Sequence, residues 1–281
     1  MAATINSSPA PAAWVPRGLR SGTPHRKGLR VNALLLVAWL TALPVHAEGA
    51  LAAGPAAVEA PADPVALAHQ TYAVAKARWE ERPDDAQAAW QLGRACFDCA
   101  DVASSDQQRA AFAREGIAAC RKAIKLDPKL GPAYYYLAMN LGQWAQTKGL
   151  GALKLVDEMV PAFQKAIELD PTFDFAGPHR SLGLLYRDAP GWPISVGSRA
   201  KARRHLEKAV ALSPDYPDNR LSLIEAYLAW GDTKAARAQI EPTRKGLEAA
   251  RRRFTGLRWQ RSWADWNQRW QRVLRKLKQS E

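Results

Sequence analysis

Cysteine is the residue type in this sequence with the widest range of chemistry. Cys96 and Cys99 form a CxxC pair, a spacing used by zinc ligands and by thiol redox sites, and Cys120 is the third cysteine. Zinc in proteins needs four ligands, and a lone CxxC supplies two of them. We therefore expect structural thiols or a disulfide staple, and no metal site.

The histidines offer no catalytic arrangement. The three that follow residue 47 are His69, His179 and His205, which stand on separate predicted helices without a serine or cysteine nucleophile motif beside them. The sequence has no Walker loop, no GxGxxG after a strand and no HExxH. It predicts no catalytic residue and no cofactor, so a non-enzymatic role is favoured over a hydrolase or a thiol redox enzyme.

Repeated helices are the elements that must position any functional side chain. The segments RKAIKLDP, QKAIELDP and EKAVALSP end at Pro128, Pro171 and Pro214, so they recur with a period of 43 residues. Each has an alanine five residues before its proline, where one helix must come close to the next. The proline then stops the helix, because its ring clashes with the preceding turn. A fixed period of this size indicates an array of helical units.

A second helical stretch recurs with these endings. It is WQLGRAC from Trp90, YYYLAMNL from Tyr134, HRSLGLLY from His179 and RLSLIEAY from Arg220. In these stretches a leucine is followed by a small or branched residue and, three positions after that, by a bulky residue. This spacing resembles that of the A-helix of a tetratricopeptide repeat (TPR). The resemblance covers roughly residues 64–242. It implies an all-α fold, an array of TPR-like helical hairpins (an α-solenoid) that more often binds a protein or peptide than catalyses a reaction.

The array, residues 64–243, is expected to start with a sealing half-repeat and to carry long loops. A helix is predicted over 64–81, capped by Asp63. Its apolar face would comprise Val65, Leu67, Tyr72, Val74, Ala75 and Trp79. Each repeat exceeds the usual ~34 residues by ~9. The excess is expected between the A and B helices, at 101–108, 146–156 and 187–198. In the last loop Trp192 predicts a turn over the protein's own core, with a ligand gate as the alternative.

Residues 244–281 are expected to form a basic, tryptophan-rich helix. Its apolar residues recur at steps of three and four, which places them on one face: Trp259, Trp263, Trp266, Trp270, Val273 and Leu277. A helix that caps the fourth repeat is favoured. Peripheral membrane contact through 258–278 is the alternative. No nucleic-acid partner is expected, because the net charge of +13 collects at the two ends and leaves the repeats nearly neutral.

The first 47 residues are predicted to be a signal peptide. The region before its apolar core is unusually long, which a start codon assigned too far upstream would explain. Arg26, Lys27 and Arg30 precede the apolar stretch 31–43, and the residues before Ala47 suit cleavage after it. Thirteen apolar residues are short for a bilayer core of ~30 Å, but an uncleaved membrane anchor stays open as the alternative. The Ala/Pro-rich residues 48–63 are expected to be a linker. The mature protein would then be periplasmic or secreted.

Export would place the cysteines in an oxidising compartment, where pairing is the default. In the TPR arrangement Cys96 and Cys120 fall at facing positions of the first A and B helices. The resemblance therefore implies a Cys96–Cys120 disulfide, with Cys99–Cys120 as the second choice.

The TPR resemblance also implies a groove lined by the A-helices. Counted from the repeat leucines, its residues are Trp90, Arg94, Phe97, Tyr135, Met139, Gly142, Arg180, Leu184, Arg187, Leu221, Glu225 and Leu228. This aromatic and apolar lining with arginines suits a peptide, or a hydrophobic or anionic small ligand. Packing between repeats is an equally weighted alternative for Trp90, Phe97 and Leu184.

A narrower resemblance lies in LGLLYRDAPGWPISVGSRAKARRHLEKAVALSP, residues 182–214. It is similar to the T component of some TRAP-type solute transporters, an exported TPR-like protein that assembles with a solute-binding protein. We therefore expect an exported scaffold for protein–protein interaction in the cell envelope. The alternative is a T-component-like transport accessory that docks a solute-binding protein or holds a hydrophobic or anionic ligand.

Overall fold

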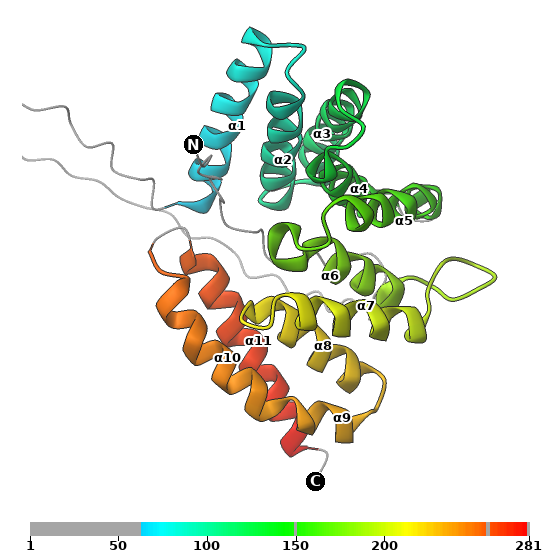
Figure 1. Cartoon of the computed structure of the whole chain (residues 1–281), viewed down its shortest axis with the longest axis vertical. Helices are drawn as coiled ribbons and strands as arrows, with labels where there is room; N and C mark the ends of the chain where they lie inside the picture. Colours follow the sequence, from blue (N-terminus) through cyan, green and yellow to red (C-terminus); the bar gives the residue numbers. More distant parts are fainter. Residues whose placement is uncertain (1–62, 149–150, 257–258, 280–281) are drawn as a thin grey trace, which may run out of the picture. The chain divides into compact units, whose positions relative to one another are not determined.

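The computed structural model describes residues 63–148, 151–256 and 259–279, and these residues form helices in series (Figure 1). The helices are α1 (Pro64–Glu81), α2 (Ala86–Asp101), α3 (Asp106–Leu126), α4 (Gly131–Ala145), α5 (Ala152–Leu169), α6 (Phe173–Asp188), α7 (Arg199–Leu212), α8 (Pro217–Ala229), α9 (Thr233–Ala238), α10 (Ile240–Arg253) and α11 (Gln260–Lys278). The predicted signal peptide and nearly all of the predicted linker lie outside the described residues. Within the described residues, every helix falls short of the length and hydropathy that a bilayer span requires.

Consecutive helices pair as antiparallel hairpins, α2 with α3, α4 with α5 and α6 with α7 (Figure 1). The second helices of these hairpins end at Leu126, Leu169 and Leu212, which keeps the 43-residue step of the sequence. The all-α array of hairpins is therefore confirmed.

Small residues let neighbouring helices approach closely. A Cβ on Gly93 would collide with the Cys120 sulfur, and one on Gly183 would lie 2.8 Å from the Leu206 side chain. Asn140 fixes the contact between the first two hairpins, because its amide donates to the Gly93 carbonyl at 2.8 Å. The alanine of each repeated helix ending is also buried, as the close approach requires.

The first helix keeps its predicted bounds but only part of its predicted packing. Asp63 caps α1 by accepting a hydrogen bond from the Val65 amide at 3.0 Å. Tyr72, Ala75 and Trp79 pack against α2 and α3, as expected. The other three predicted members of the apolar face are exposed: Val65, Leu67 and Val74. The prediction was wrong for them, because only one side of α1 meets another helix.

The connections within the hairpins differ from the expected long loops. In the first repeat the loop covers only 102–105, because α3 starts at Asp106 and is 21 residues long. The second connection is 146–151, and the third, 189–198, is the longest. Its Trp192 is 89% exposed, so the prediction that Trp192 covers the protein's own core was wrong.

Two helices occupy the region predicted as one basic helix. α10 begins at Ile240, before the expected boundary at 244, and the chain turns after Phe254 before α11 begins at Gln260. α11 packs on α8, where Val273 and Leu277 join the core of the fourth repeat. Trp266 and Trp259 are buried with Tyr216 and Phe254 in a separate aromatic cluster. The prediction of a capping helix is thus confirmed. Peripheral membrane contact through 258–278 is not supported, because most of the apolar side chains that it would need are buried.

Candidate functional site

One narrow face of α2 remains accessible, and we call it the α2 stripe. Its members are Gln87, Trp90, Arg94, Asp98 and Asp101, which follow one another at steps of three and four. The residues between them are mostly buried against neighbouring helices. α2 therefore presents a single mixed aromatic and charged surface.

The aromatic end of the α2 stripe is held in place by three contacts. The Trp90 ring stacks on Tyr136 at 5.9 Å between centroids and meets Phe173 edge-on at 6.2 Å. The Trp90 indole N–H donates to the Gln87 side-chain oxygen at 2.6 Å. Part of the indole is nevertheless exposed, so it can contact another molecule while its orientation is fixed.

The charged end combines a cation with two carboxylates. The Arg94 guanidinium lies 5.9 Å from the Tyr136 ring centre, and its Nε is 3.9 Å from an Asp98 oxygen. Burial raises the pKa of Asp98 to about 7, although Arg94 opposes the shift. Asp101 is 2.9 Å from Arg261 of α11. A carboxyl group that titrates near neutral pH marks this surface as a candidate site.

The first turn of α6 is left-handed. Asp174, Phe175 and Ala176 have φ of 50°, 56° and 61°, a conformation that costs a non-glycine residue of order 1 kcal/mol or more. Phe175 stacks on Tyr216 at 4.5 Å. Such a turn persists only when its surroundings hold it.

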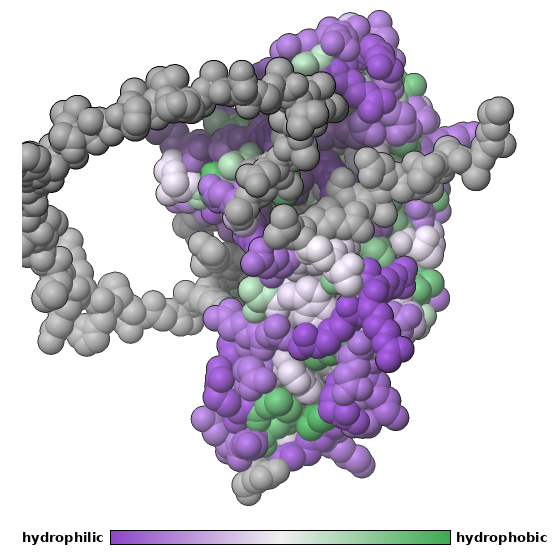
Figure 2. All heavy atoms as spheres, turned by 90° about the vertical axis from the view of Figure 1, so that its left-hand side faces the viewer, coloured by the Kyte–Doolittle hydropathy of each residue, from purple (hydrophilic) through white to green (hydrophobic). Residues whose placement is uncertain are grey.

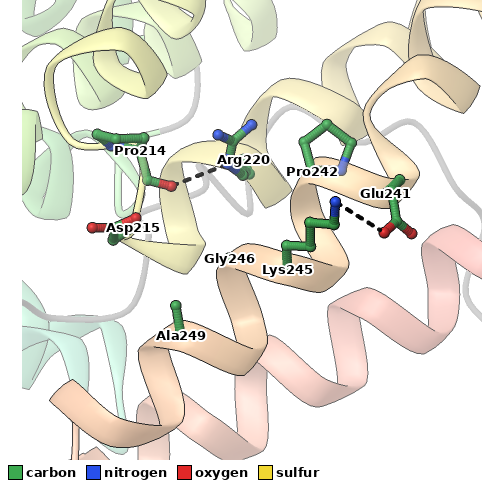
Figure 3. A pocket seen from close by; sticks show the side chains of 8 residues that line it. All are labelled: Pro214, Asp215, Arg220, Glu241, Pro242, Lys245, Gly246 and Ala249. Carbon is green, nitrogen blue, oxygen red and sulfur yellow. Dashed lines mark hydrogen bonds and ion pairs between the residues drawn. The ribbon is translucent and has the colours of Figure 1, made fainter.

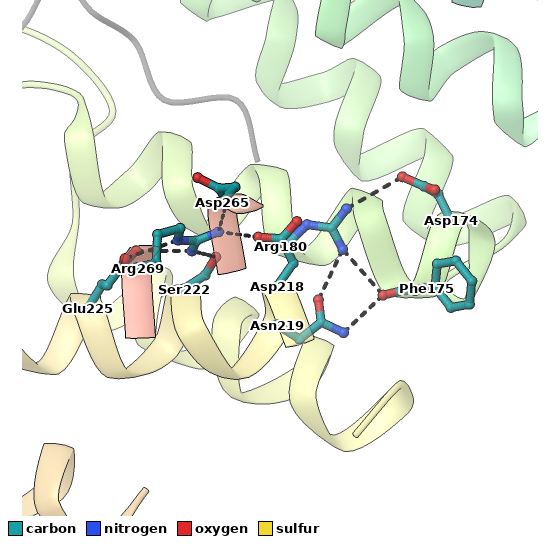
Figure 4. Close-up of polar contacts among 9 residues, drawn as sticks. All are labelled: Asp174, Phe175, Arg180, Asp218, Asn219, Ser222, Glu225, Asp265 and Arg269. Atoms are coloured by element: carbon teal, nitrogen blue, oxygen red, sulfur yellow. Dashed lines mark hydrogen bonds and ion pairs between the residues drawn. The ribbon is translucent and has the colours of Figure 1, made fainter. Parts of the chain in front are cut away.

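Hydrogen bonds from three helices hold this turn, and Figure 4 shows those that Arg180 and Asn219 donate. Asp174 accepts from the Tyr135 hydroxyl at 3.1 Å and from Arg180 at 3.4 Å. The Phe175 carbonyl accepts from Asn219 of α8 at 3.0 Å, and Asn219 also accepts from Arg180 at 3.0 Å. The turn thereby ties α4, α6 and α8 together.

Arg269 of α11 enters a ring of acceptors on α8 (Figure 4). It donates to Asp218, to Glu225 at 3.0 Å and to the Ser222 hydroxyl at 3.1 Å. Asp265, one turn earlier on α11, is 3.3 Å away. Burial alone would lower the pKa of Arg269, but these carboxylates raise it well above its usual value. The capping helix is thus locked to the fourth repeat by charge as well as by apolar contact.

Two family models match parts of this chain. Residues 63–179 match the family model described as "Regulator of microtubule dynamics protein 1-3", and residues 194–245 match the one described as "Tetratricopeptide repeat". The crystal structure of TTC0263, a thermophilic TPR protein of Thermus thermophilus, is similar with a TM-score of 0.53. It is 22% identical, and the match covers 75% of this chain and 97% of that chain. The fold is that of a TPR protein.

Two further structural comparisons are more distant. MamA is 19% identical with a TM-score of 0.44, over 67% of this chain and 91% of that chain. Yeast Tom70 is 13% identical with a TM-score of 0.32, over 77% of this chain and 60% of that chain. None of the curated proteins matches this chain.

The TPR array places the predicted groove residues in two groups. Seven are buried: Phe97, Tyr135, Met139, Gly142, Arg180, Leu184 and Leu221. Five keep some exposed surface: Trp90, Arg94, Arg187, Glu225 and Leu228. Trp90 and Arg94 come together on the α2 stripe, while Arg187 pairs with Asp188 at 2.7 Å and Glu225 with Arg269. The ligand-binding role of this set stays a prediction.

Sequence reasoning missed the acidic members of the site. Asp98 lies four residues after Arg94, the spacing of a helical ion pair, so counting along α2 would have found it. Asp174 gave no such signal, because its role depends on the left-handed turn and on Tyr135 from another helix.

The three cysteines are free thiols and are all buried, which contradicts the expected Cys96–Cys120 disulfide. The Cys120 sulfur lies against Gly93, one turn before Cys96, and fills the space that this glycine leaves. Burial raises the pKa of Cys99 to about 12 and that of Cys96 still further. Such thiols are poor nucleophiles.

Two surface hollows lie elsewhere on the array. A cavity of about 420 Å³ lies between the start of α8 and α10, where Pro214, Arg220, Pro242 and Lys245 line it (Figure 3). Both of its cations are already engaged, Arg220 with the Pro214 carbonyl at 3.0 Å and Lys245 with Glu241 at 3.7 Å.

On one side of the molecule the surface over α10 and α11 is mostly hydrophilic (Figure 2), which suits the polar end of an array.

The second hollow, of about 460 Å³, contains a histidine pair on α6 and α7. The Nδ1 atoms of His179 and His205 are 3.0 Å apart. Burial, His179 and nearby cations lower the pKa of His205 to about 4. Arg204 and Lys208 line the same hollow and would repel a metal cation. Across the described ranges, no three His, Cys, Asp or Glu side chains gather to hold a metal ion.

Proposed function

We propose that this TPR protein is a non-enzymatic scaffold that binds a segment of a partner protein along the α2 stripe. The observation that carries the proposal is the composition of this single accessible face of α2. An oriented indole at one end supplies apolar contact area, and Arg94 with Asp98 supplies charges that a peptide can pair with. TPR arrays are generally scaffolds, which supports a role without chemistry of its own.

The α2 stripe would favour a partner with an apolar side chain near a cation. Asp98 stays partly protonated near neutral pH because its charge is poorly solvated. A lysine or arginine of the partner would lower the pKa of Asp98 and pair with the carboxylate. Binding should therefore strengthen as the pH rises from about 6 to 8.

Site-specific cross-linking in cells tests the proposal. A photo-reactive amino acid at Gln87, the exposed end of the α2 stripe, should give a defined protein adduct that Trp90→Ala removes. The matched control is Arg114, which is exposed on α3 away from the stripe. Equal adducts from Gln87 and Arg114, or adducts that survive Trp90→Ala, would refute binding at the stripe.

We further propose that the scaffold acts in the cell envelope, on the basis of the predicted signal peptide. An alkaline phosphatase fused after residue 62 should be active only if the chain is exported, and Leu36→Arg, within 31–43, should abolish that activity. Retained activity in Leu36→Arg would remove the support for export. A fusion that stays in the membrane fraction would favour the uncleaved anchor.

Two other candidate functions each have one observation in their favour. The resemblance of 182–214 favours a transport accessory of the TRAP T-component kind, which mass spectrometry would support by finding a retained hydrophobic or anionic ligand. The family model that matches 63–179 is named for microtubule dynamics. The basic end of the chain would suit an acidic polymer, and co-sedimentation with polymerised tubulin tests this.

A further inference from the structure

The loop between α6 and α7 presents two apolar side chains at its tip. Trp192 is 89% exposed and Ile194 is 66% exposed; among the large hydrophobic side chains of the described residues, only Val74 on α1, also at 66%, matches Ile194. Leaving an indole and an aliphatic side chain of one loop in water is unfavourable. Their exposure on one protruding loop (Figure 1) therefore points to contact with another phase or molecule.

The loop is held in shape by its own backbone. The Gly197 amide donates to the Pro190 carbonyl and the Ser198 amide to the Tyr186 carbonyl, both at 2.8 Å. A Cβ on Gly197 would collide with the Ala189 carbonyl, so only glycine lets the two sides of the loop meet. The tip is thus presented in an ordered conformation, and little entropy is lost when it binds.

A basic surface follows the tip directly. α7 begins at the end of the loop and carries three exposed cations at steps of three and four, which places Lys201, Arg204 and Lys208 on one face. A fourth, Arg199, lies over the Trp230 ring on another side of the helix. Its one acid, Glu207, already accepts from the Tyr227 hydroxyl at 2.8 Å and from Arg203 at 3.0 Å. The surface beside the tip is therefore positively charged, and its counterpart should be anionic.

We propose that the 191–204 surface binds an anionic lipid bilayer, with Trp192 and Ile194 inserted at the headgroup boundary and the α7 cations on lipid phosphates. Tryptophan beside lysine and arginine is the combination that the membrane interface favours. The tip carries only two large exposed apolar side chains, with Pro193 between them, which suits shallow insertion into a lipid layer better than a broad protein interface. α11 does not compete for this role, because its Trp266, Val273 and Leu277 are buried in the array.

A local probe tests the proposal without interference from other membrane-binding segments. A polarity-sensitive dye is coupled to Trp192→Cys in the full chain, and to Val74→Cys as the matched control, since Val74 is also 66% exposed. The native thiols are buried and react slowly. Vesicles containing phosphatidylglycerol should shift the emission of the dye at 192 to the blue, whereas phosphatidylcholine vesicles should not. The dye at 74 should respond to neither.

Charge reversal on α7 provides the second arm. Lys201→Glu with Arg204→Glu should weaken the response at 192 about tenfold or more, because each cation near an anionic surface contributes a several-fold factor. Raising the salt concentration should act in the same direction. The proposal is overturned if the dye at 192 does not respond, responds equally to both vesicles, or matches the dye at 74. A response at 192 to envelope proteins but not to vesicles would overturn it in favour of a protein socket.

Discussion

Replacing Arg269 by methionine should weaken the attachment of the capping helix to the fourth repeat. The Arg269 side chain is 7% exposed and that of Asp218 is 1% exposed, so the substitution leaves a carboxylate buried without its cation. Removing one partner of such a pair costs about 3–5 kcal/mol. Glu225 and Asp265 are more exposed and can regain water, which places the expected cost at about 3 kcal/mol, a large part of the stability of a small domain.

Urea unfolding followed by circular dichroism measures this cost. Arg272→Met is the matched control, because Arg272 lies on the exposed side of the same helix and should change the free energy of unfolding by less than about 0.5 kcal/mol. The double variant Arg269→Met with Asp218→Asn should recover most of the loss, since it removes the stranded charge. A cost below about 1 kcal/mol for Arg269→Met, or no recovery in the double variant, would refute the proposed charge lock.

Three other predictions test the site and the core. Asp98→Asn should raise the stability by up to about 4 kcal/mol at pH 8, since a pKa near 7 lies about three units above the usual 3.8 and each unit corresponds to about 1.4 kcal/mol. It should change the stability little at pH 4, because the raised pKa of Asp98 makes the wild type lose stability as the pH rises from about 4 to 7. Urea melts at both pH values decide this, and a pH-independent effect would contradict it. Ala176→Gly should leave the free energy of unfolding nearly unchanged, since relief of the left-handed strain offsets the lost methyl group. Ala209→Gly, in a regular buried helix, should lower it by about 1–2 kcal/mol. Equal losses in the two variants would contradict the strain at Ala176. Thiol titration should find no fast-reacting cysteine in the native protein and all three in urea, and a single thiol in urea without reductant would mean that a disulfide forms after all.

The repeat architecture was predictable because its signals lie in residues that are close together along the chain. Proline, the alanine before it and the 43-residue step located the ends of α3, α5 and α7, and Asp63 with Pro64 located the start of α1. These signals depend on neighbours along the chain, so no knowledge of distant contacts was needed.

Features that depend on distant contacts escaped prediction. The apolar spacing of α1 gave no way to tell Val65, which is exposed, from Tyr72, which packs against another helix. The left-handed turn at Asp174 carries neither glycine nor asparagine, and its support comes from α4 and α8. The exposure of Trp192 was missed for a similar reason, because burial was inferred from residue type alone. On the α2 stripe, Trp90 and Arg94 were predicted, and their acidic neighbour Asp98 was not.

The bonds of Asn219 bear on the order in which the chain acquires its structure. Its amide donates to the carbonyls of Phe175, Ala209 and Ser213, so one side chain joins the beginning of α6 to the end of α7. During synthesis, the third hairpin leaves the ribosome before this residue does. The first turn of α6 therefore reaches its final conformation only after α8 has been synthesised. The start of α6 is thus expected to fold late, although most of the array depends on local sequence.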